Sequence, residues 1–285
     1  MAIKTRKISD WLSANGQTIT NASAASMKAY LEQNLRSLQD GVYIGKIQKE
    51  TWGTYMRCEA WQTASIGISK ADADAVVVQH GSTRIGIALT EPSAVMKWGS
   101  VQNASSVGYQ TSSDWSLLDG KTRTAAIMAS SYYKNDSPST YAVAYCYNYS
   151  KSHTGDPGGD VSIPAKSWHL PATGELEIIR SHIETINLAL QRIKNAGKQS
   201  ADLLTRTYYW SCVEDSGTNA WILNFGNGFR GTNGKVDGSR RVRPVTAFLS
   251  FYLFTSLPLF DRRSGKQGWE VENYEHINNN NITNN

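Results

Sequence analysis

The segment YYWSCVEDSGTNAWILNFGNG, Tyr208–Gly228, carries short apolar runs divided by residues that favour turns. Within it, Ala220–Phe225 alternates between small or polar and large apolar side chains, which predicts a strand. The next stretch, Gly226–Arg240, contains five glycines. A stretch so poor in large apolar side chains buries little surface, so we expect it on the outside of the fold. Arg241–Val245 predicts the last strand, which would hold the exposed stretch at its far end.

The clearest helix precedes this region and spans Gly174–Asn195. Thr173 is suited to cap its N-terminus, and Gly197 is suited to end it. Glu175 and Glu177 lie in the first turn, where the helix dipole favours acidic residues. Its apolar residues recur at steps of three or four along one face, and they are Leu176, Ile179, Ile183, Ile186, Leu190 and Ile193. This pattern predicts a single core helix.

Further elements are expected upstream. The β-branched runs Ala75–Gln79 and Arg84–Leu89, on either side of Gly81, predict a hairpin. Asp119–Ser131 predicts a short helix. Thr140–Tyr149 carries alternating Ala and Tyr, a pattern that fits either a helix or a strand.

One more helix is predicted near the N-terminus, over Ala22–Gln39. Its apolar stripe consists of Met27, Tyr30, Leu31, Leu35 and Leu38. A helix this short needs a surface to pack on, which is either its own domain or a neighbouring subunit. We assign this helix to a small N-terminal extension, residues 1–70.

The composition narrows the class of partner. Charged residues make up 19% of the chain, and nine Trp and fourteen Tyr are many for its length, which suits a contact surface. The net charge is +5, but the chain has no run of five or six Lys or Arg, so we expect no nucleic acid among its partners. The apolar run Phe248–Phe260 is far shorter than the roughly 20 residues that span a bilayer. We recognise no signal peptide and expect no membrane span.

The residues that could carry chemistry do not form a catalytic or metal-binding motif. The cysteines Cys58, Cys146 and Cys212 lack the spacing of metal ligands or of a redox pair, and we expect buried thiols. None of the five histidines has a carboxylate at ligand spacing. The sequence therefore predicts a protein that is not an enzyme and that uses no metal and no cofactor.

Several segments occur in an order known from one fold. WHLPATGELEII (Trp168–Ile179), Tyr208–Gly228 and RRVRPVTAF (Arg240–Phe248) follow the upstream segments RIGIALTE, MKWGS, DGKTRTAAI and AYCYNYS. In this order they resemble the bacterial C-type-lectin-like domain of surface and phage proteins. The resemblance implies an α+β, C-type-lectin-like fold.

The resemblance also implies a division of the chain. It places the C-type-lectin-like domain over residues 71–248, after the extension over residues 1–70. Within the domain, residues 208–248 would form the variable, ligand-binding part. Residues 249–285 remain as a C-terminal tail, whose Asn-rich end we expect to be disordered.

Within this class the chain is similar to the target proteins of diversity-generating retroelements. Those systems mutate adenines of a template, so that Asn codons change into a set of residues that lacks Trp, Lys, Glu, Gln and Met. Between Asp215 and Arg240 only Trp221 and Lys235 belong to the missing group, whereas ordinary composition predicts about five. An ordinary lectin-like loop is the alternative. The resemblance assigns the variable surface to Asp215, Ser216, Thr218, Ile222, Phe229, Gly231, Thr232, Asn233, Val236, Asp237 and Arg240.

A surface that tolerates exchange needs strands that do not change. We expect these strands to be anchored by Trp210, Trp221, Phe225, Val242 and Val245. We expect Arg241 and Arg243 to cover the core with their stems or to pair with a carboxylate such as Glu175.

These features predict a ligand-binding protein that recognises an unidentified macromolecule, a protein or a glycan, at a cell surface. A receptor-binding part of a phage tail, and so a virion protein, fits the missing signal peptide better than a bacterial surface adhesin. Because the resemblance begins near Ala75, we expect the N-terminal helix to mediate assembly, as a homo-oligomer or within a virion. Two other functions stay open. One is an enzyme of the formylglycine-generating type, for which Cys212 lacks a partner cysteine, and the other is a purely structural virion subunit.

Overall fold

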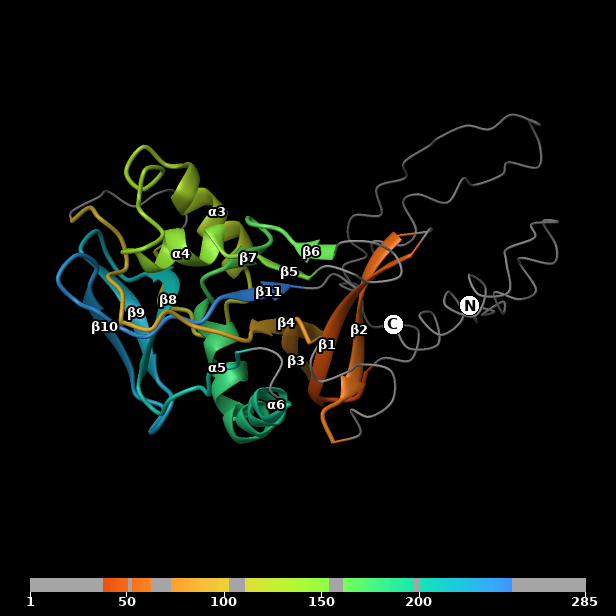
Figure 1. Cartoon of the computed structure of the whole chain (residues 1–285). Helices are drawn as coiled ribbons and strands as arrows, with labels where there is room; N and C mark the ends of the chain where they lie inside the picture. Colours follow the sequence, from red (N-terminus) through yellow and green to blue (C-terminus); the bar gives the residue numbers. More distant parts are fainter. Residues whose placement is uncertain are drawn as a thin grey trace, which may run out of the picture. The chain divides into compact units, whose positions relative to one another are not determined.

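The computed structural model describes residues 38–50, 53–62, 73–102, 111–153, 161–196 and 200–247 (Figure 1). All of them lie in one compact unit, Met1–Phe248. The described residues form antiparallel sheets together with helices, which confirms an α+β fold. The tail over residues 249–285 lies outside the described residues.

The largest sheet has six strands in the order β2-β1-β3-β4-β11-β7, with antiparallel neighbours throughout. These strands are β1 (Gly41–Glu50), β2 (Gly53–Ala60), β3 (Ala75–His80), β4 (Thr83–Ala88), β7 (Trp168–His169) and β11 (Val245–Ala247). The predicted hairpin is confirmed as β3 and β4. Gly81 lies in its turn with φ +56°, in the left-handed region that glycine adopts without strain.

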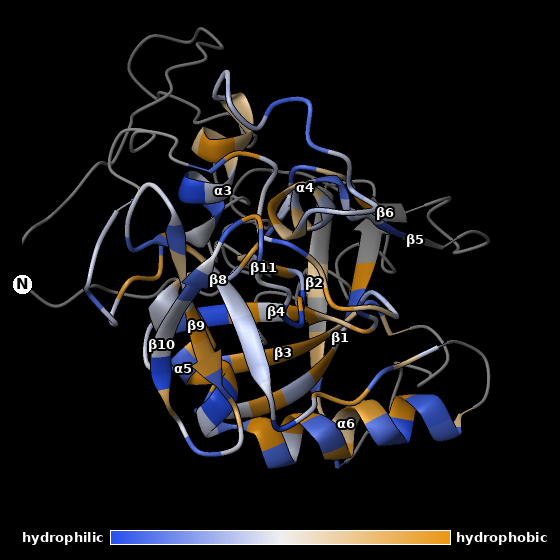
Figure 2. Cartoon of the chain, turned by 90° about the vertical axis from the view of Figure 1, so that its left-hand side faces the viewer, coloured by the Kyte–Doolittle hydropathy of each residue, from blue (hydrophilic) through white to orange (hydrophobic). Residues whose placement is uncertain are grey.

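Strand β3 is buried on both faces. Val76 and Val78 belong to one hydrophobic cluster, and Val77, which points the other way, belongs to another. This explains why the sequence of β3 is an unbroken apolar run instead of an alternating one. Figure 2 shows β3 and β4 largely in the colour of hydrophobic residues.

The predicted core helix consists of two helices, α5 (Thr173–Ser181) and α6 (Ile183–Asn195). His182 separates them with φ −110° and ψ 10°, and its ring Nδ1 lies 3.0 Å from the carbonyl oxygen of Ile178. The predicted cap Thr173 is also wrong, because its hydroxyl donates to the carbonyl of Asp114 and not to the helix. Gly197 lies outside the described residues.

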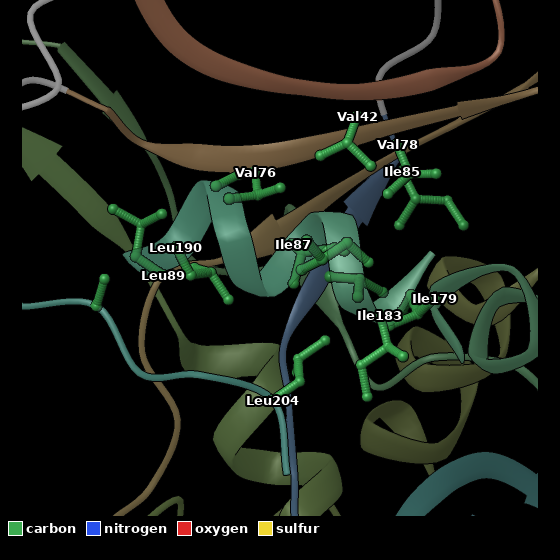
Figure 3. Packing of buried hydrophobic residues seen from close by; sticks show 14 of the residues in the cluster. Val42, Val76, Val78, Ile85, Ile87, Leu89, Ile179, Ile183, Leu190 and Leu204 are labelled. Atoms are coloured by element: carbon green, nitrogen blue, oxygen red, sulfur yellow. The ribbon is translucent and has the colours of Figure 1, made fainter. Parts of the chain in front are cut away.

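The apolar stripe survives the break and packs on the six-stranded sheet. Figure 3 shows Ile183 and Leu190 beside Val76 and Ile87 of the sheet. The residues of this cluster are almost completely buried, and they include Val42, Ile44, Val76, Val78, Ile85, Ile87, Leu176, Ile179, Ile183, Ile186, Leu190 and Ile193.

Two further helices lie between β4 and β7 in the sequence. The predicted helix over Asp119–Ser131 is confirmed as α3 (Gly120–Ala129), and Thr140–Tyr149 forms a helix, α4 (Ala142–Asn148). A short hairpin and a three-stranded sheet complete the described elements, with the strands β5 (Lys151–His153), β6 (Val161–Ile163), β8 (Tyr208–Glu214), β9 (Asn219–Asn224) and β10 (Arg230–Gly234).

The six-stranded sheet begins earlier than the predicted domain boundary at residue 71. β1 pairs with β3 over Gly41–Gly45, and Val42 and Ile44 are buried in the cluster under α6. Residues 41–60 therefore contribute two strands to the sheet. The predicted helix over Ala22–Gln39 lies outside the described residues except for Leu38 and Gln39, which precede β1 and are not helical.

We predict that Ile44→Ala lowers the free energy of unfolding by about 2–5 kcal/mol, because it leaves a cavity under α6. The measurement is urea unfolding followed by tryptophan fluorescence. The control is Val95→Ala, at a site that is 51% exposed, which should stay within about 0.5 kcal/mol of the parent. Similar losses in the two variants would mean that β1 is not part of the core.

Candidate functional site

The predicted surface belongs to the sheet of β8, β9 and β10, in which β9 is central and β10 forms one edge (Figure 1, left). Strands β8 and β9 lie between two hydrophobic clusters. Tyr209 and Leu223 belong to one cluster, and Trp210 and Ile222 belong to the other. No residue of β10 belongs to either cluster, so the hydrophobic core contacts β8 and β9 directly, and β10 is held by its pairing with β9 and by polar contacts.

This arrangement corrects one assignment and supports another. Ile222, predicted on the variable surface, is only 4% exposed, because β9 faces the core on both sides. Trp221, predicted as an anchor of the strands, is half-buried and packs against the second of these clusters. Its indole N–H donates to the carbonyl of Ser112 at 2.6 Å, and its ring meets that of Trp115 edge to face with centroids 5.5 Å apart.

A buried ion pair fixes the far end of β10. The side chains of Lys235 and Glu214 are both 0% exposed, and Nζ of Lys235 donates to Oε1 of Glu214 at 2.5 Å. The same ammonium donates to the carbonyl of Gly217 and lies 5.0 Å from the ring centroid of Trp98. The backbone N–H of Lys235 also donates to the carbonyl of Thr218. Lys235 is therefore a core residue inside a stretch that the sequence predicts to be exposed.

The turn between β9 and β10 is held by amide side chains. Oδ1 of Asn224 accepts the backbone N–H of Gly226 and of Asn227, and Oδ1 of Asn227 accepts that of Phe229. Gly228 has φ +76°, and a Cβ there would lie 3.1 Å from the guanidinium carbon of Arg180. The turn therefore holds its shape without the side chain of Phe229.

The chain after β10 returns to the fold through main-chain hydrogen bonds. Arg240 and Met96 exchange two backbone hydrogen bonds at 3.0 Å. Arg241 donates its N–H to the carbonyl of Tyr208 and accepts the N–H of Trp210. The predicted last strand therefore differs, since residues 240 and 241 form isolated bridges and β11 begins at Val245.

The arginines pair with a carboxylate, as predicted, but with that of Glu91 and not that of Glu175. Arg241 and Arg243 lie 3.1 and 3.4 Å from the carboxylate of Glu91, which also accepts the Tyr209 hydroxyl. Glu175 instead pairs with His169. Burial raises the pKa of Glu91, although the two guanidinium groups act in the opposite direction. The closing segment is thus fastened to the chain that leaves β4.

Four residues at one end of the sheet form what we call the Phe229 cluster: Tyr208, Phe229, Gly231 and Arg240. Phe229 is 56% exposed, and its ring meets that of Tyr208 edge to face with centroids 6.4 Å apart. The guanidinium carbon of Arg240 lies 5.4 Å from the Tyr208 centroid. A Cβ on Gly231 would lie 2.6 Å from Cε1 of Phe229, so the ring covers this glycine. Two aromatic rings and a guanidinium at a surface are typical anchors in protein recognition.

The other predicted residues do not join this cluster. Gly234 pairs with Asn219, which places the turn between β8 and β9 at the opposite end from Phe229. Thr232 lies between the two ends, opposite Trp221, and is exposed. The partly or fully exposed residues at the second end are Asp215, Ser216, Thr218, Asn233, Val236 and Asp237. The structure thus divides the predicted surface into two groups joined by β10.

The sequence did not predict that Arg230, Trp115 and Glu177 contribute to this region. The guanidinium carbon of Arg230 lies 4.9 Å from the ring centroid of Trp115, and its Nε donates to Oε1 of Glu177 at 2.7 Å. Trp115 stands in a polar stretch, SSDWS, and a large aromatic in such a stretch was the available signal.

No group of three or more His, Cys, Asp or Glu side chains among the described residues could hold a metal ion. A hollow of about 520 Å³ is lined by Leu188, Gln191, Arg192, Asn195 and Ala196, all at or next to α6 and none from β8, β9 or β10. Among the helices that the structure describes, none has the length and apolar character to cross a membrane.

Comparisons with known proteins assign no family to the chain. No protein-family model matches the sequence, and no curated protein matches it. Among solved structures, the chain is similar to a fimbrial protein from Bacteroides ovatus, with 13% sequence identity and a TM-score of 0.45. The match covers 74% of this chain and 49% of that one, so the chain spans about half the length of that protein.

We predict that Lys235→Met lowers the free energy of unfolding by about 3–5 kcal/mol, because it leaves the Glu214 carboxylate buried without its ammonium. The double variant Lys235→Met, Glu214→Leu should recover most of this loss, since a buried ion pair replaced by apolar residues is often neutral. Denaturant unfolding measures both.

The matched control for this experiment is Lys121→Met, at an exposed position, which should change stability by no more than about 0.5 kcal/mol. If Lys235→Met behaved like the control, the pair would not anchor β10.

Proposed function

We propose that the protein is a C-type-lectin-like binding module, the target of a diversity-generating retroelement, and that β10 and its flanking turns present the variable surface. It recognises a macromolecule at a cell surface and catalyses no reaction. We place it in a phage tail, as a receptor-binding protein, with a bacterial surface adhesin as the alternative. Assembly through the N-terminal segment would raise its apparent affinity by presenting several linked sites.

One observation carries the proposal. Between Asp215 and Arg240, Trp221 and Lys235 are the only residues that adenine mutagenesis of Asn codons does not produce. Trp221 is tied to Ser112 and Trp115, and Lys235 is completely buried against Glu214. The two residues that such mutagenesis would leave alone are thus two that hold the sheet. A lysine that is completely buried is uncommon in an ordinary surface loop, so its position supports the retroelement.

The contacts around the surface support the same division between side chains that can be exchanged and a scaffold that stays fixed. Phe229, Thr232 and Asp237 are exposed, so a change at these positions removes few core contacts. The return of the chain rests on backbone hydrogen bonds of Arg240 and Arg241, which any side chain other than proline permits. Exchange of surface side chains and retention of the fold are therefore compatible.

The position of Cys212 argues against the formylglycine-generating alternative. The thiol is completely buried, and burial raises its pKa well above the ordinary value of 9.0. The thiolate is the reactive form of cysteine, so this side chain lacks both the ionisation and the access that thiol chemistry needs. Cys146 and Cys58 are buried as well, with the pKa of Cys58 raised to about 12.

We predict that iodoacetamide at about pH 8 modifies none of the three cysteines in the folded protein, because all three thiols are buried and protonated. Mass spectrometry of the intact protein measures the added mass. After unfolding in urea all three should react, which is the internal control. Rapid alkylation of Cys212 in the native protein would favour the enzyme.

Sequencing the same locus from many isolates tests the proposed function. We expect substitutions concentrated at the exposed positions of residues 215–240, with Trp221 and Lys235 unchanged. At Ile222 we expect apolar replacements only, because the side chain packs in the core. Substitutions spread evenly over the domain would contradict the retroelement, and an unvaried surface would favour a purely structural subunit.

A further inference from the structure

Strand β10 presents main-chain hydrogen-bonding groups at an edge of its sheet where no other strand of the described residues pairs with it. Asn224 donates its N–H to the carbonyl of Phe229, and Lys235 donates its N–H to the carbonyl of Thr218. These bonds fix which residues of β10 face β9, because the direction alternates along an antiparallel strand. Residues 229, 231, 233 and 235 therefore direct their N–H and C=O groups toward β9 and the residues that flank it. Arg230 and Thr232, which alternate with them, direct these groups away from β9. β10 ends the sheet, so these groups lie at its outer edge.

The edge lacks the usual protection against pairing. Natural edge strands are guarded by lysines, prolines or inward-pointing charges, and RGTNG has only one charged residue and no proline. That residue, Arg230, has its guanidinium bound to Glu177 and stacked over Trp115, so the charge is held beside the sheet. Gly231 and Gly234 add no side chain that would hinder an approaching backbone.

We propose that the ligand is a protein and that an extended segment of it adds as a strand to β10. The proposal rests on the proposed function and narrows its ligand class. The outward groups of Arg230 and Thr232 recur at about 6.8 Å, the two-residue repeat of a strand. A peptide backbone offers donors and acceptors at that repeat, whereas the hydroxyl groups of a glycan have no such spacing. β10 therefore matches a peptide better than a sugar.

Strand addition also suits a surface whose side chains change. The N–H of residue 232 is present whether the side chain is Thr or another residue, so the main chain supplies affinity that substitution does not remove. Specificity comes from side chains on the two faces of the added strand. Phe229 over Gly231 stands on one face, and the Thr232 side chain stands on the other, toward Trp221. β10 is short, so these flanking contacts must supply part of the binding energy.

The test uses the full chain and a displayed library of random linear peptides as the probe. Thr232→Pro removes the outward N–H and blocks the edge, while every hydrogen bond between β9 and β10 remains. Thr232→Val is the matched control, because it changes the side chain and keeps the N–H. We expect selected peptides to lose at least about tenfold in affinity on the proline variant and to bind the valine variant nearly as well as the parent.

A second measurement does not depend on the variants. Hydrogen exchange on the wild-type chain with a bound peptide should protect the amides of Arg230 and Thr232. Peptides that bind the proline variant equally well, or that leave these amides unprotected, would overturn the proposal. So would a library that yields no binder, or a dimer in sedimentation that Thr232→Pro dissolves, which would assign the edge to a second copy.

A glycan array separates this failure from failure of the proposed function. Glycan binding that Phe229→Ser abolishes and Thr232→Pro leaves intact would keep the variable surface and reject the added strand. Binding of any ligand that neither variant changes would reject both.

Discussion

The pairing of strand β11 with two other strands is the constraint on which the rest of the fold depends. The strand has three residues, and it pairs with β4 on one side and with β7 on the other. The chain leaves this sheet after β4, returns to it at β7 and leaves it again until β11, and the candidate surface lies on the second excursion, between β7 and β11. Arg243 fixes the return, because its buried guanidinium donates to the carbonyls of Ala88 and Asp202. The ladder closes this long loop, so the side chains at its tip do not have to.

The candidate surface is held in two ways that leave its exposed side chains out. Backbone hydrogen bonds bring Arg240 beside Met96, and the Lys235–Glu214 pair fixes the opposite end of β10. A buried ion pair adds little net stability, since desolvation offsets most of the attraction. It does penalise every arrangement in which the pair is broken, and so it favours one position for β10. A strand without a core face of its own needs such a constraint.

The sequence predicted the structure correctly where a pattern of residues is compatible with one structure only. The apolar run of β3 and the periodicity of α5 and α6 located the core, but the break at His182 was hidden because the stripe continues in phase across it. Ile222 was misplaced since alternation does not reveal that both faces of β9 are covered. Lys235 in a glycine-rich stretch resembles a solvated lysine until Glu214 is known. Val42 and Ile44 do alternate as in a strand, so the sequence carries a signal for β1 that the predicted extension over residues 1–70 leaves unused.

The contact between Phe229 and Gly231 links the side chains that these two positions of the surface can carry. The aromatic ring occupies the space that any Cβ at position 231 would need, with only 2.6 Å between them. A larger residue at 231 therefore moves an aromatic side chain at 229 into another rotamer, and the ring keeps its present position only over glycine. The shape of the surface at position 229 thus depends on the residue at position 231. If the proposed exchange of side chains takes place, these two positions act as one unit of shape and not as two independent choices.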